Sequence, residues 1–241
     1  MADTYRNLDE DAILRTLERL RLRVGERFPG RGLADVCTEL LAVTREHTAR
    51  VDGLARPLYG LRALVAILLL GAGGLLAWLL WQKMLPFGAS AGAFDTAESI
   101  ESTVNILVLT GAGVWFLMNL EARIKRNRAL ESLHELRAFA HVIDMHQLTK
   151  DPAAGESTSS SPTRDLTDFQ LVRYLDYCAE MLSLVGKVSA LYMQRLRDPV
   201  VIQAANDIED LTSGFAQKIW QKIMIVRAQM TPFVSGAGPR S

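Results

Sequence analysis

The sequence has little cysteine, few aromatic residues and no excess of charge of either sign. Its 241 residues include 2 cysteines, 7% aromatic residues, and 27 Lys plus Arg against 27 Asp plus Glu. Two cysteines far apart, Cys37 and Cys178, exclude the disulfide framework that stabilises small secreted domains. The balanced charge argues against a general nucleic-acid binder, which needs a basic excess on one face.

Motifs that carry catalytic chemistry are missing as well. The chain has no GxSxG nucleophile elbow, no P-loop, no HExxH zinc motif and no dinucleotide-binding fingerprint. The serine run at 157–161 lies in a low-complexity segment and has the composition of a linker. We therefore expect no catalytic residues, no cofactor and no enzymatic activity.

Two long uncharged runs are the most informative feature that is present. Residues 63–81 read ALVAILLLGAGGLLAWLLW, and residues 102–120 read STVNILVLTGAGVWFLMNL. As a helix, each run spans about 28 Å, close to the hydrocarbon thickness of a bilayer. Buried helices of soluble proteins rarely stay apolar on every face over such a length. We predict transmembrane helices at 58–81 and 102–120, joined by a short external loop at 82–101.

Basic residues flank these two runs on the side away from the loop. They are Arg45, Arg50, Arg56 and Arg62 before the first run, and Arg123, Lys125, Arg126 and Arg128 after the second. The loop carries Lys83 against several carboxylates. Because cytoplasmic flanks are enriched in Lys and Arg, we expect a multi-pass protein with both termini in the cytoplasm. The excess of arginine over lysine favours a prokaryotic source, hence a bacterial inner (plasma) membrane.

Small and polar residues within the runs have two interpretations each. Five glycines near mid-span are candidates for close helix packing, within one hairpin or between subunits: Gly71, Gly73, Gly74, Gly111 and Gly113. Four polar residues in or beside the second run are candidates for lining a pore: Glu101, Asn105, Thr110 and Asn119. Glycine is common in membrane helices, and single Asn or Thr residues also hold helices together, so both alternatives stay open.

The remaining segments have the apolar spacing of amphipathic helices, which makes the predicted fold class all-α with coiled-coil-like seams. Residues 1–57 form a cytoplasmic helical hairpin through a Pro-Gly turn, and 121–150 form a stalk continuous with the second span. Residues 165–230 form a second hairpin, which reverses at Asp198-Pro199 because Asp is a good N-cap and Pro fits the first helical position. Residues 151–164 and 231–241 have the composition of a disordered linker and tail.

The histidines allow weak functional hypotheses. The stalk carries His134, His141, Asp144 and His146, but on a straight helix His134 and His141 lie two turns apart, too far to bind one ion. We expect no metal site, with these four as weak candidates. His47 interrupts the apolar seam of the helix at 33–55, where either a pH response or a register-fixing polar contact explains it.

Together these patterns favour a membrane-anchored, self-associating helical scaffold or signalling component that presents cytoplasmic helices to a partner. The expected partners are the lipid bilayer, further copies of the chain and a cytoplasmic protein, with no nucleic acid. The alternative is a homo-oligomeric ion channel lined by the second transmembrane helix.

Overall fold

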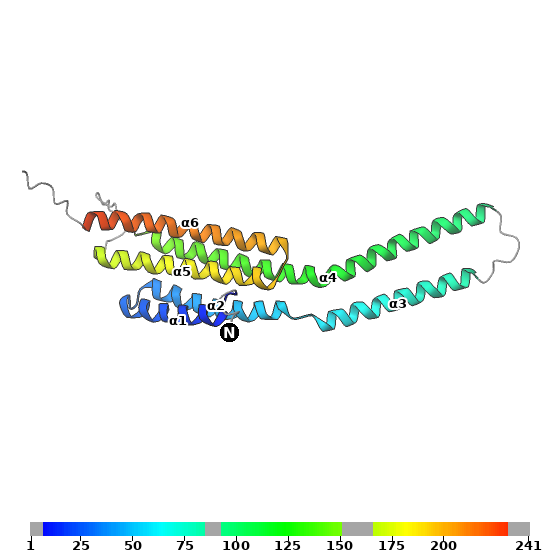
Figure 1. Ribbon diagram of the computed structural model, residues 1–241, viewed down its shortest axis with the longest axis horizontal. Coiled ribbons are helices and arrows are strands. Elements are labelled where there is room, and N and C mark those ends of the chain that lie inside the picture. Colours follow the sequence, from blue (N-terminus) through cyan, green and yellow to red (C-terminus); the bar gives the residue numbers. More distant parts are fainter. Residues whose placement is uncertain (1–6, 85–92, 151–165, 231–241) are drawn as a thin grey trace, which may run out of the picture. The chain divides into compact units, whose positions relative to one another are not determined.

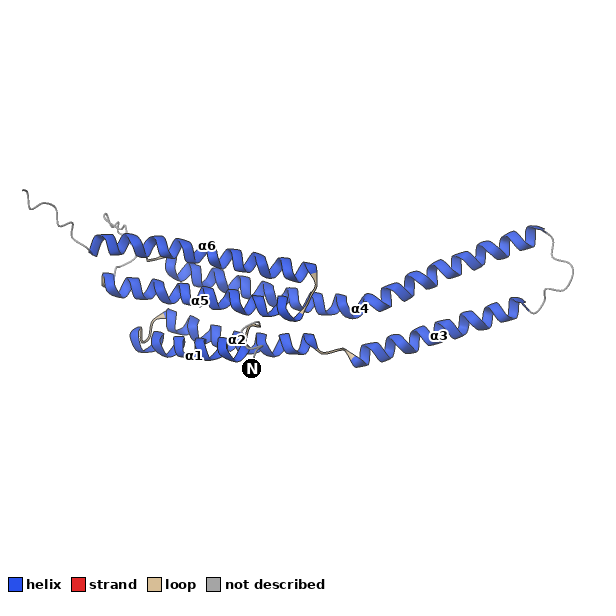
Figure 2. Ribbon diagram, viewed as in Figure 1, coloured by secondary structure: helices blue, strands red, loops and turns tan. Residues whose placement is uncertain are grey.

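A computed structural model describes residues 7–84, 93–150 and 166–230. These residues form six helices, and none of them forms a strand. The helices are α1 (Glu10–Arg27), α2 (Gly32–Ala55), α3 (Tyr59–Met84), α4 (Ala93–Leu148), α5 (Asp168–Arg195) and α6 (Pro199–Met230) (Figures 1 and 2). The predicted all-α fold class is therefore confirmed. The predicted linker at 151–164 and tail at 231–241 lie outside the described residues.

The chain divides into two compact units. The first contains residues 1–55 and 128–241, so it comprises α1, α2, the last part of α4, α5 and α6. The second contains residues 56–127, which include α3 and the first part of α4.

Local sequence signals set the ends of the helices in the first unit. The Asp9 carboxylate caps α1 by accepting the backbone N–H of Asp11 at 3.0 Å. After α1, Gly30 adopts a φ of 69°, which glycine tolerates without steric cost, and the chain turns into α2. Thr167 and Gln170 form a reciprocal capping box at the start of α5. The Asp198 side chain accepts the backbone N–H groups of α6 at 3.0 and 3.3 Å, as the Asp-Pro signal predicts.

Helix α5 lies at the centre of the first unit. Its buried residues occur on most of its circumference, and it contacts α1, α2 and α6. The last part of α4 also packs against it and against α6. The backbone carbonyl of His146 accepts the Tyr174 hydroxyl of α5 at 3.5 Å, and Gln147 binds Lys222 of α6. Most positions of the predicted seams are buried, and Leu17, Leu20, Leu136 and Ile143 are completely inaccessible, whereas Phe169 in the first turn of α5 is 55% exposed.

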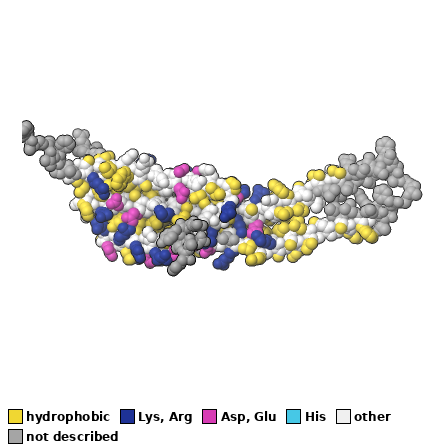
Figure 3. All heavy atoms as spheres, viewed as in Figure 1, with side chains coloured by type: hydrophobic (Ala, Val, Ile, Leu, Met, Phe, Trp, Pro, Cys, Tyr) yellow, Lys and Arg dark blue, Asp and Glu magenta, His cyan; other side chains and the backbone are white. Residues whose placement is uncertain are grey.

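The second unit has an unusual surface for a protein in water. Many of its large apolar side chains are exposed (Figure 3): Leu64, Ile67, Leu68, Leu70, Leu75, Trp78, Trp81, Val104, Val108, Leu109, Trp115, Phe116 and Met118. One helical stretch of the described residues, within Gly32–Leu75, is long and apolar enough to cross a membrane, and its apolar window is not buried at all. Within that stretch, the uncharged run that starts at Ala63 belongs to α3.

The segment between the two apolar runs differs from its prediction. Residues 82–101 were expected to form a loop, yet α3 continues to Met84 and α4 already begins at Ala93. The residues from Ala93 to Glu101 contain no glycine or proline, and Ala and Glu are strong helix formers. The loop prediction was wrong at both of its ends because it used the edges of the apolar runs as helix ends. Residues 85–92 lie outside the described residues.

Candidate functional site

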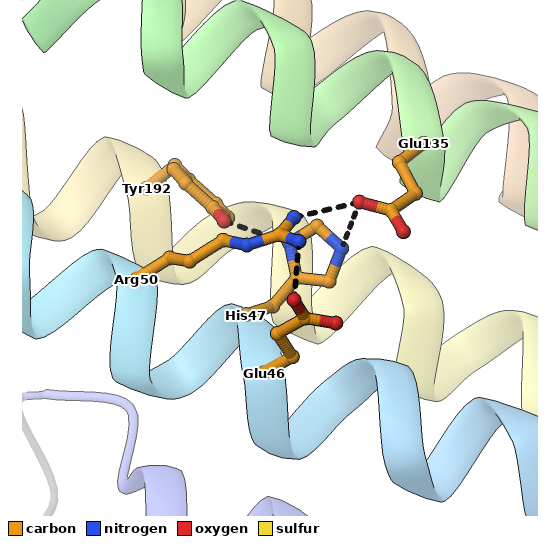
Figure 4. Close-up of polar contacts among 5 residues, drawn as sticks. All are labelled: Glu46, His47, Arg50, Glu135 and Tyr192. Carbon is orange, nitrogen blue, oxygen red and sulfur yellow. Dashed lines mark hydrogen bonds and ion pairs between the residues drawn. The ribbon is translucent and has the colours of Figure 1, made fainter.

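The most unusual polar contact of the first unit surrounds His47. This residue lies on α2 and is completely buried among apolar side chains. Its Nδ1 atom is 2.7 Å from the hydroxyl oxygen of Tyr192 on α5 (Figure 4). Its Nε2 atom is 3.4 Å from a carboxylate oxygen of Glu135 on α4. One imidazole ring therefore joins three helices that are distant in the sequence.

Charged side chains cover the outer side of this contact. Arg50, one turn after His47 on α2, donates to the same Glu135 oxygen at 2.7 Å and to Glu46 at 2.6 Å (Figure 4). Arg50 and Glu135 are both partly exposed, and both line a groove of about 500 Å³ on the bundle surface. The guanidinium group thus neutralises the carboxylate that faces His47.

Burial determines the ionisation of the site. It lowers the pKa of His47 to about 4, although the nearby Glu135 carboxylate acts in the opposite direction. Burial also raises the pKa of Tyr192 to about 12. Near pH 7 both groups are therefore neutral. We assign the ring hydrogen to Nε2 because this nitrogen faces the Glu135 carboxylate, which leaves Nδ1 to accept the Tyr192 hydroxyl. The site therefore favours the neutral imidazole. Its hydrogen-bonding capacity is used only in part, because Nε2 has no well-formed hydrogen bond.

This geometry bears on both interpretations of His47. A hydrogen bond between α2 and α5 inside an apolar seam fixes the register of the two helices, because a slipped alignment would leave two buried polar groups unpaired. The same burial makes the contact sensitive to acid, because a charged imidazole is costly in this environment. We call His47, Tyr192 and Glu135 the polar latch, because their contacts join α2, α5 and α4 around a neutral histidine.

The stalk histidines do not meet one another. His134 is exposed, and the His141 ring makes an edge contact with Phe215 of α6 at 5.4 Å between centroids. The His146 ring lies against Gly32, and Asp144 accepts the side-chain amide of Gln147 at 2.6 Å. Across the described ranges, no group of three or more His, Cys, Asp or Glu residues is placed to hold a metal ion. Packing with neighbouring helices accounts for the positions of His141 and His146.

The glycines and polar residues of the apolar runs lie apart from other described side chains. A Cβ atom added at any of the five candidate glycines would meet no atom within 4 Å in the described part of the chain. Asn105 is exposed, Thr110 is partly exposed, and the side-chain amide of Asn119 donates to the Trp115 carbonyl one turn earlier at 2.7 Å. The Glu101 side chain lies outside the described residues. At these glycines, the helices of the two apolar runs in one chain are therefore not seen to pack closely against each other.

A second polar cluster joins α3 and α4 within the second unit. The Glu121 carboxylate of α4 accepts the Arg62 guanidinium at 2.6 Å, the Lys125 ammonium at 2.9 Å and the backbone N–H of Leu58 at 3.3 Å. The Glu121 and Lys125 side chains are only 16% and 15% exposed. Hydrogen bonds from Arg62 and then Lys125 lower the pKa of Glu121 to about 2. This ionised cluster ties the start of α3 to α4 directly after the second apolar run.

One further buried contact, between Gln147 of α4 and Lys222 of α6, could not be predicted from the sequence patterns. The side-chain oxygen of the buried Gln147 accepts the Lys222 ammonium at 2.7 Å, and its backbone carbonyl accepts the same group at 3.1 Å. The two cysteines, Cys37 and Cys178, are buried, and burial raises the pKa of both thiols, to about 11 and 12. Such thiols remain protonated and act as small apolar groups.

Comparison with known proteins adds no relative: no family model, no curated protein and no solved structure matches the chain. The fold and the site define its class as an all-α protein, in which a helical bundle is joined to a unit whose apolar helices are exposed.

Proposed function

We propose that this protein is a membrane-anchored helical scaffold or signalling component without enzymatic activity. In this proposal α3 and the 102–120 part of α4 cross the bilayer as a hairpin. The bundle, which comprises the first unit, lies in the cytoplasm with both termini. The chain self-associates and presents the outer faces of its cytoplasmic helices to a protein partner.

One observation carries the membrane part of the proposal. In the first unit the large apolar residues of the seams are buried, whereas in the second they are exposed, with Ile67 at 69%, Leu70 at 77% and Leu109 at 73%. Apolar surface of this extent is rare on soluble monomers and marks contact with a membrane or another protein. Exposure on both α3 and the first part of α4 supports two spans, since a helix in lipid gains from having apolar residues on every face.

The polar residues at the ends of the two runs support the proposed orientation. The cluster of Arg62, Glu121 and Lys125 joins the two helices where both would leave the hydrocarbon, at the predicted cytoplasmic boundary. Trp78 and Trp81 are exposed near the opposite end of α3. Tryptophan is enriched at membrane interfaces, because its ring is apolar and its N–H is polar.

Cysteine labelling tests the membrane topology. We expect Ser90→Cys, between the spans, to react with a membrane-impermeant maleimide on intact spheroplasts. We expect Ser213→Cys, at an exposed position of α6, to react only after the membrane is permeabilised. The native Cys37 and Cys178 are a suitable background because both are buried. Equal labelling of both variants without permeabilisation, or recovery of the chain in the soluble fraction, would contradict the proposal.

The scaffold part of the proposal rests on apolar residues that the bundle leaves exposed. On α6 these are Trp220, Met224 and Ile225, and on α4 they include Met145 and Leu148. Deleting residues 152–241 is a poor test of partner binding, because it would remove the central α5 and expose the whole core. Single surface substitutions such as Trp220→Ser leave the buried seam of α6 intact and are better suited to this purpose.

Self-association can be measured directly as the mass of the full chain in detergent. We expect light scattering coupled to size exclusion, with the detergent contribution subtracted, to give a defined oligomer. A monomer would contradict the self-associating part of the proposal, and it would also remove the channel alternative, since two spans cannot enclose a pore. A complex of four or more chains would make ion flux in liposomes, with Glu101→Gln and Asn105→Ala as variants, the next measurement.

A further inference from the structure

Cationic residues gather at what we call the base of the second unit, which is the start of α3 together with the part of α4 directly after the second apolar run. Their positions suit a role beyond setting the orientation of the chain in the membrane. Within the second unit, Arg56 and Arg62 lie at the start of the α3 side, and Arg123, Lys125 and Arg126 follow the second apolar run. The acidic residue among them is Glu121, whose carboxylate is shared by Arg62 and Lys125. One carboxylate between two cations leaves a net positive charge at this cluster, to which the exposed Arg56 and Arg123 add.

Arg123 is held in an orientation that suits a lipid headgroup. Its side chain is exposed, and its guanidinium lies over the ring of Phe116 at 5.6 Å from the centroid. Phe116 belongs to the apolar run, so the side chain extends back along α4 toward that run instead of away from it. In a membrane this places a planar donor group at the edge of the hydrocarbon, which is the depth of the phospholipid phosphates.

Arg56 adds a second exposed cation on the α3 side of the same cluster. It precedes Leu58 by two residues, and the backbone N–H of Leu58 is bound to Glu121, which precedes Arg123 by two residues. The Glu121 contact therefore holds the two chain segments that carry Arg56 and Arg123 next to each other. Residues two apart on a helix lie on nearly opposite sides, so Arg123 does not face the Glu121 contact, and the two arginines are placed to bind neighbouring phosphates instead of sharing one.

From these contacts we propose that the base of the second unit is a binding site for anionic phospholipid headgroups of the cytoplasmic leaflet, with Arg56 and Arg123 as its main phosphate donors. The Arg62–Glu121–Lys125 cluster acts as the positioning element that holds together the two segments that carry these arginines. This inference rests on the proposed membrane-anchored function and adds the class of lipid that the anchor selects.

Native mass spectrometry of the full chain in a mild non-ionic detergent tests the site. The chain is titrated with phosphatidylglycerol and, separately, with phosphatidylcholine of the same acyl chains. We expect phosphatidylglycerol to bind more tightly. Each of Arg56→Gln and Arg123→Gln should weaken its binding about fivefold, since a basic residue near an anionic surface contributes about 1 kcal/mol. Binding of phosphatidylcholine should not change. Arg123→Lys, which keeps the charge, should weaken phosphatidylglycerol binding less than Arg123→Gln does.

Arg137→Gln is the matched control, because it removes the same charge from an exposed position of α4 in the bundle. If it weakens phosphatidylglycerol binding as much as Arg123→Gln does, net charge explains the effect and the site is refuted. Equal binding of the two lipids also refutes it. Competition by inorganic phosphate at millimolar concentration would show that the site takes free phosphate instead of a headgroup. If the labelling of Ser90→Cys shows a spanning protein while the lipids bind equally, the inference fails and the proposed function stands.

Discussion

Replacing Phe28 by alanine is expected to destabilise the bundle by about 3–5 kcal/mol and to release the hairpin of α1 and α2 from α5. Phe28 follows α1 directly and is 2% exposed. Its ring makes edge contacts with Tyr174 and Tyr177 of α5, at 5.5 and 6.2 Å between centroids. Each such aromatic pair contributes about 0.5–1.5 kcal/mol beyond the apolar area it buries, so the truncation removes two pairs and leaves a cavity.

Hydrogen exchange measured by mass spectrometry on the full chain in detergent separates local release from global unfolding. We expect peptides from α1 and α2 to lose protection in Phe28→Ala, because this hairpin is the part that the ring fastens to α5. The matched control is Phe169→Ala, which removes the same side chain from a position on α5 that is 55% exposed. Its effect should stay below about 1 kcal/mol. Equal effects of the two variants would show that the ring of Phe28 does not hold the hairpin in place.

The sequence was sufficient to predict the helices of the bundle, because their ends and their buried faces are encoded locally. The spacing of Ile13, Leu17, Leu20 and Val24 predicts the buried face of α1, and all four are buried. Asp198 and Pro199 predict the start of α6, because Asp caps the helix and Pro fits its first position. The start of α4 was predicted too late, because hydrophobicity marks the edge of a membrane run and not the end of a helix.

The contacts between distant helices could not be predicted in this way. His47 was recognised as a polar residue in an apolar seam, yet nothing in its periodicity indicates that Tyr192 and Glu135 are its partners. Those two residues look like an ordinary seam residue and an ordinary surface carboxylate in their own helices. The pairing depends on which helix faces match in three dimensions, and a 3.6-residue pattern gives the face of a helix but not its neighbour. The same reason explains why the Gln147–Lys222 contact was missed.

Acidification is expected to destabilise the bundle through His47. In the unfolded chain its pKa is that of an ordinary histidine, about 6.5, whereas in the folded chain burial lowers the pKa to about 4. Between pH 4 and 6.5, His47 binds a proton in the unfolded state but not in the folded state. The contribution of His47 to the free energy of unfolding is therefore fully present above pH 6.5, and it is lost progressively as the pH falls toward 4. The loss amounts to about 3 kcal/mol, since each unit of pKa difference corresponds to about 1.4 kcal/mol.

The suitable comparison is the double variant His47→Leu/Tyr192→Phe. Replacing His47 alone would leave the buried Tyr192 hydroxyl with Ser132 as its remaining polar neighbour, at a cost of up to about 1–3 kcal/mol, whereas replacing both groups by apolar ones is close to neutral. Urea unfolding of the full chain in detergent, followed by circular dichroism from pH 7.5 to 4.5, gives the free energy of unfolding for each protein. We expect the double variant to lose about 2.5 kcal/mol less than the wild type over this range, because the range ends above the folded pKa of His47.

Two controls separate the latch from general acid effects. His134→Gln removes an exposed histidine and should keep the acid dependence of the wild type. Tyr192→Phe keeps His47 buried and should keep most of that dependence, although it is less stable at neutral pH. Carboxylates that do not contact His47 contribute alike in all of these proteins, so their effect cancels in the comparison. If the double variant lost as much stability as the wild type, the carboxylates would be the titrating groups, and His47 would serve only to fix the register of α2 and α5.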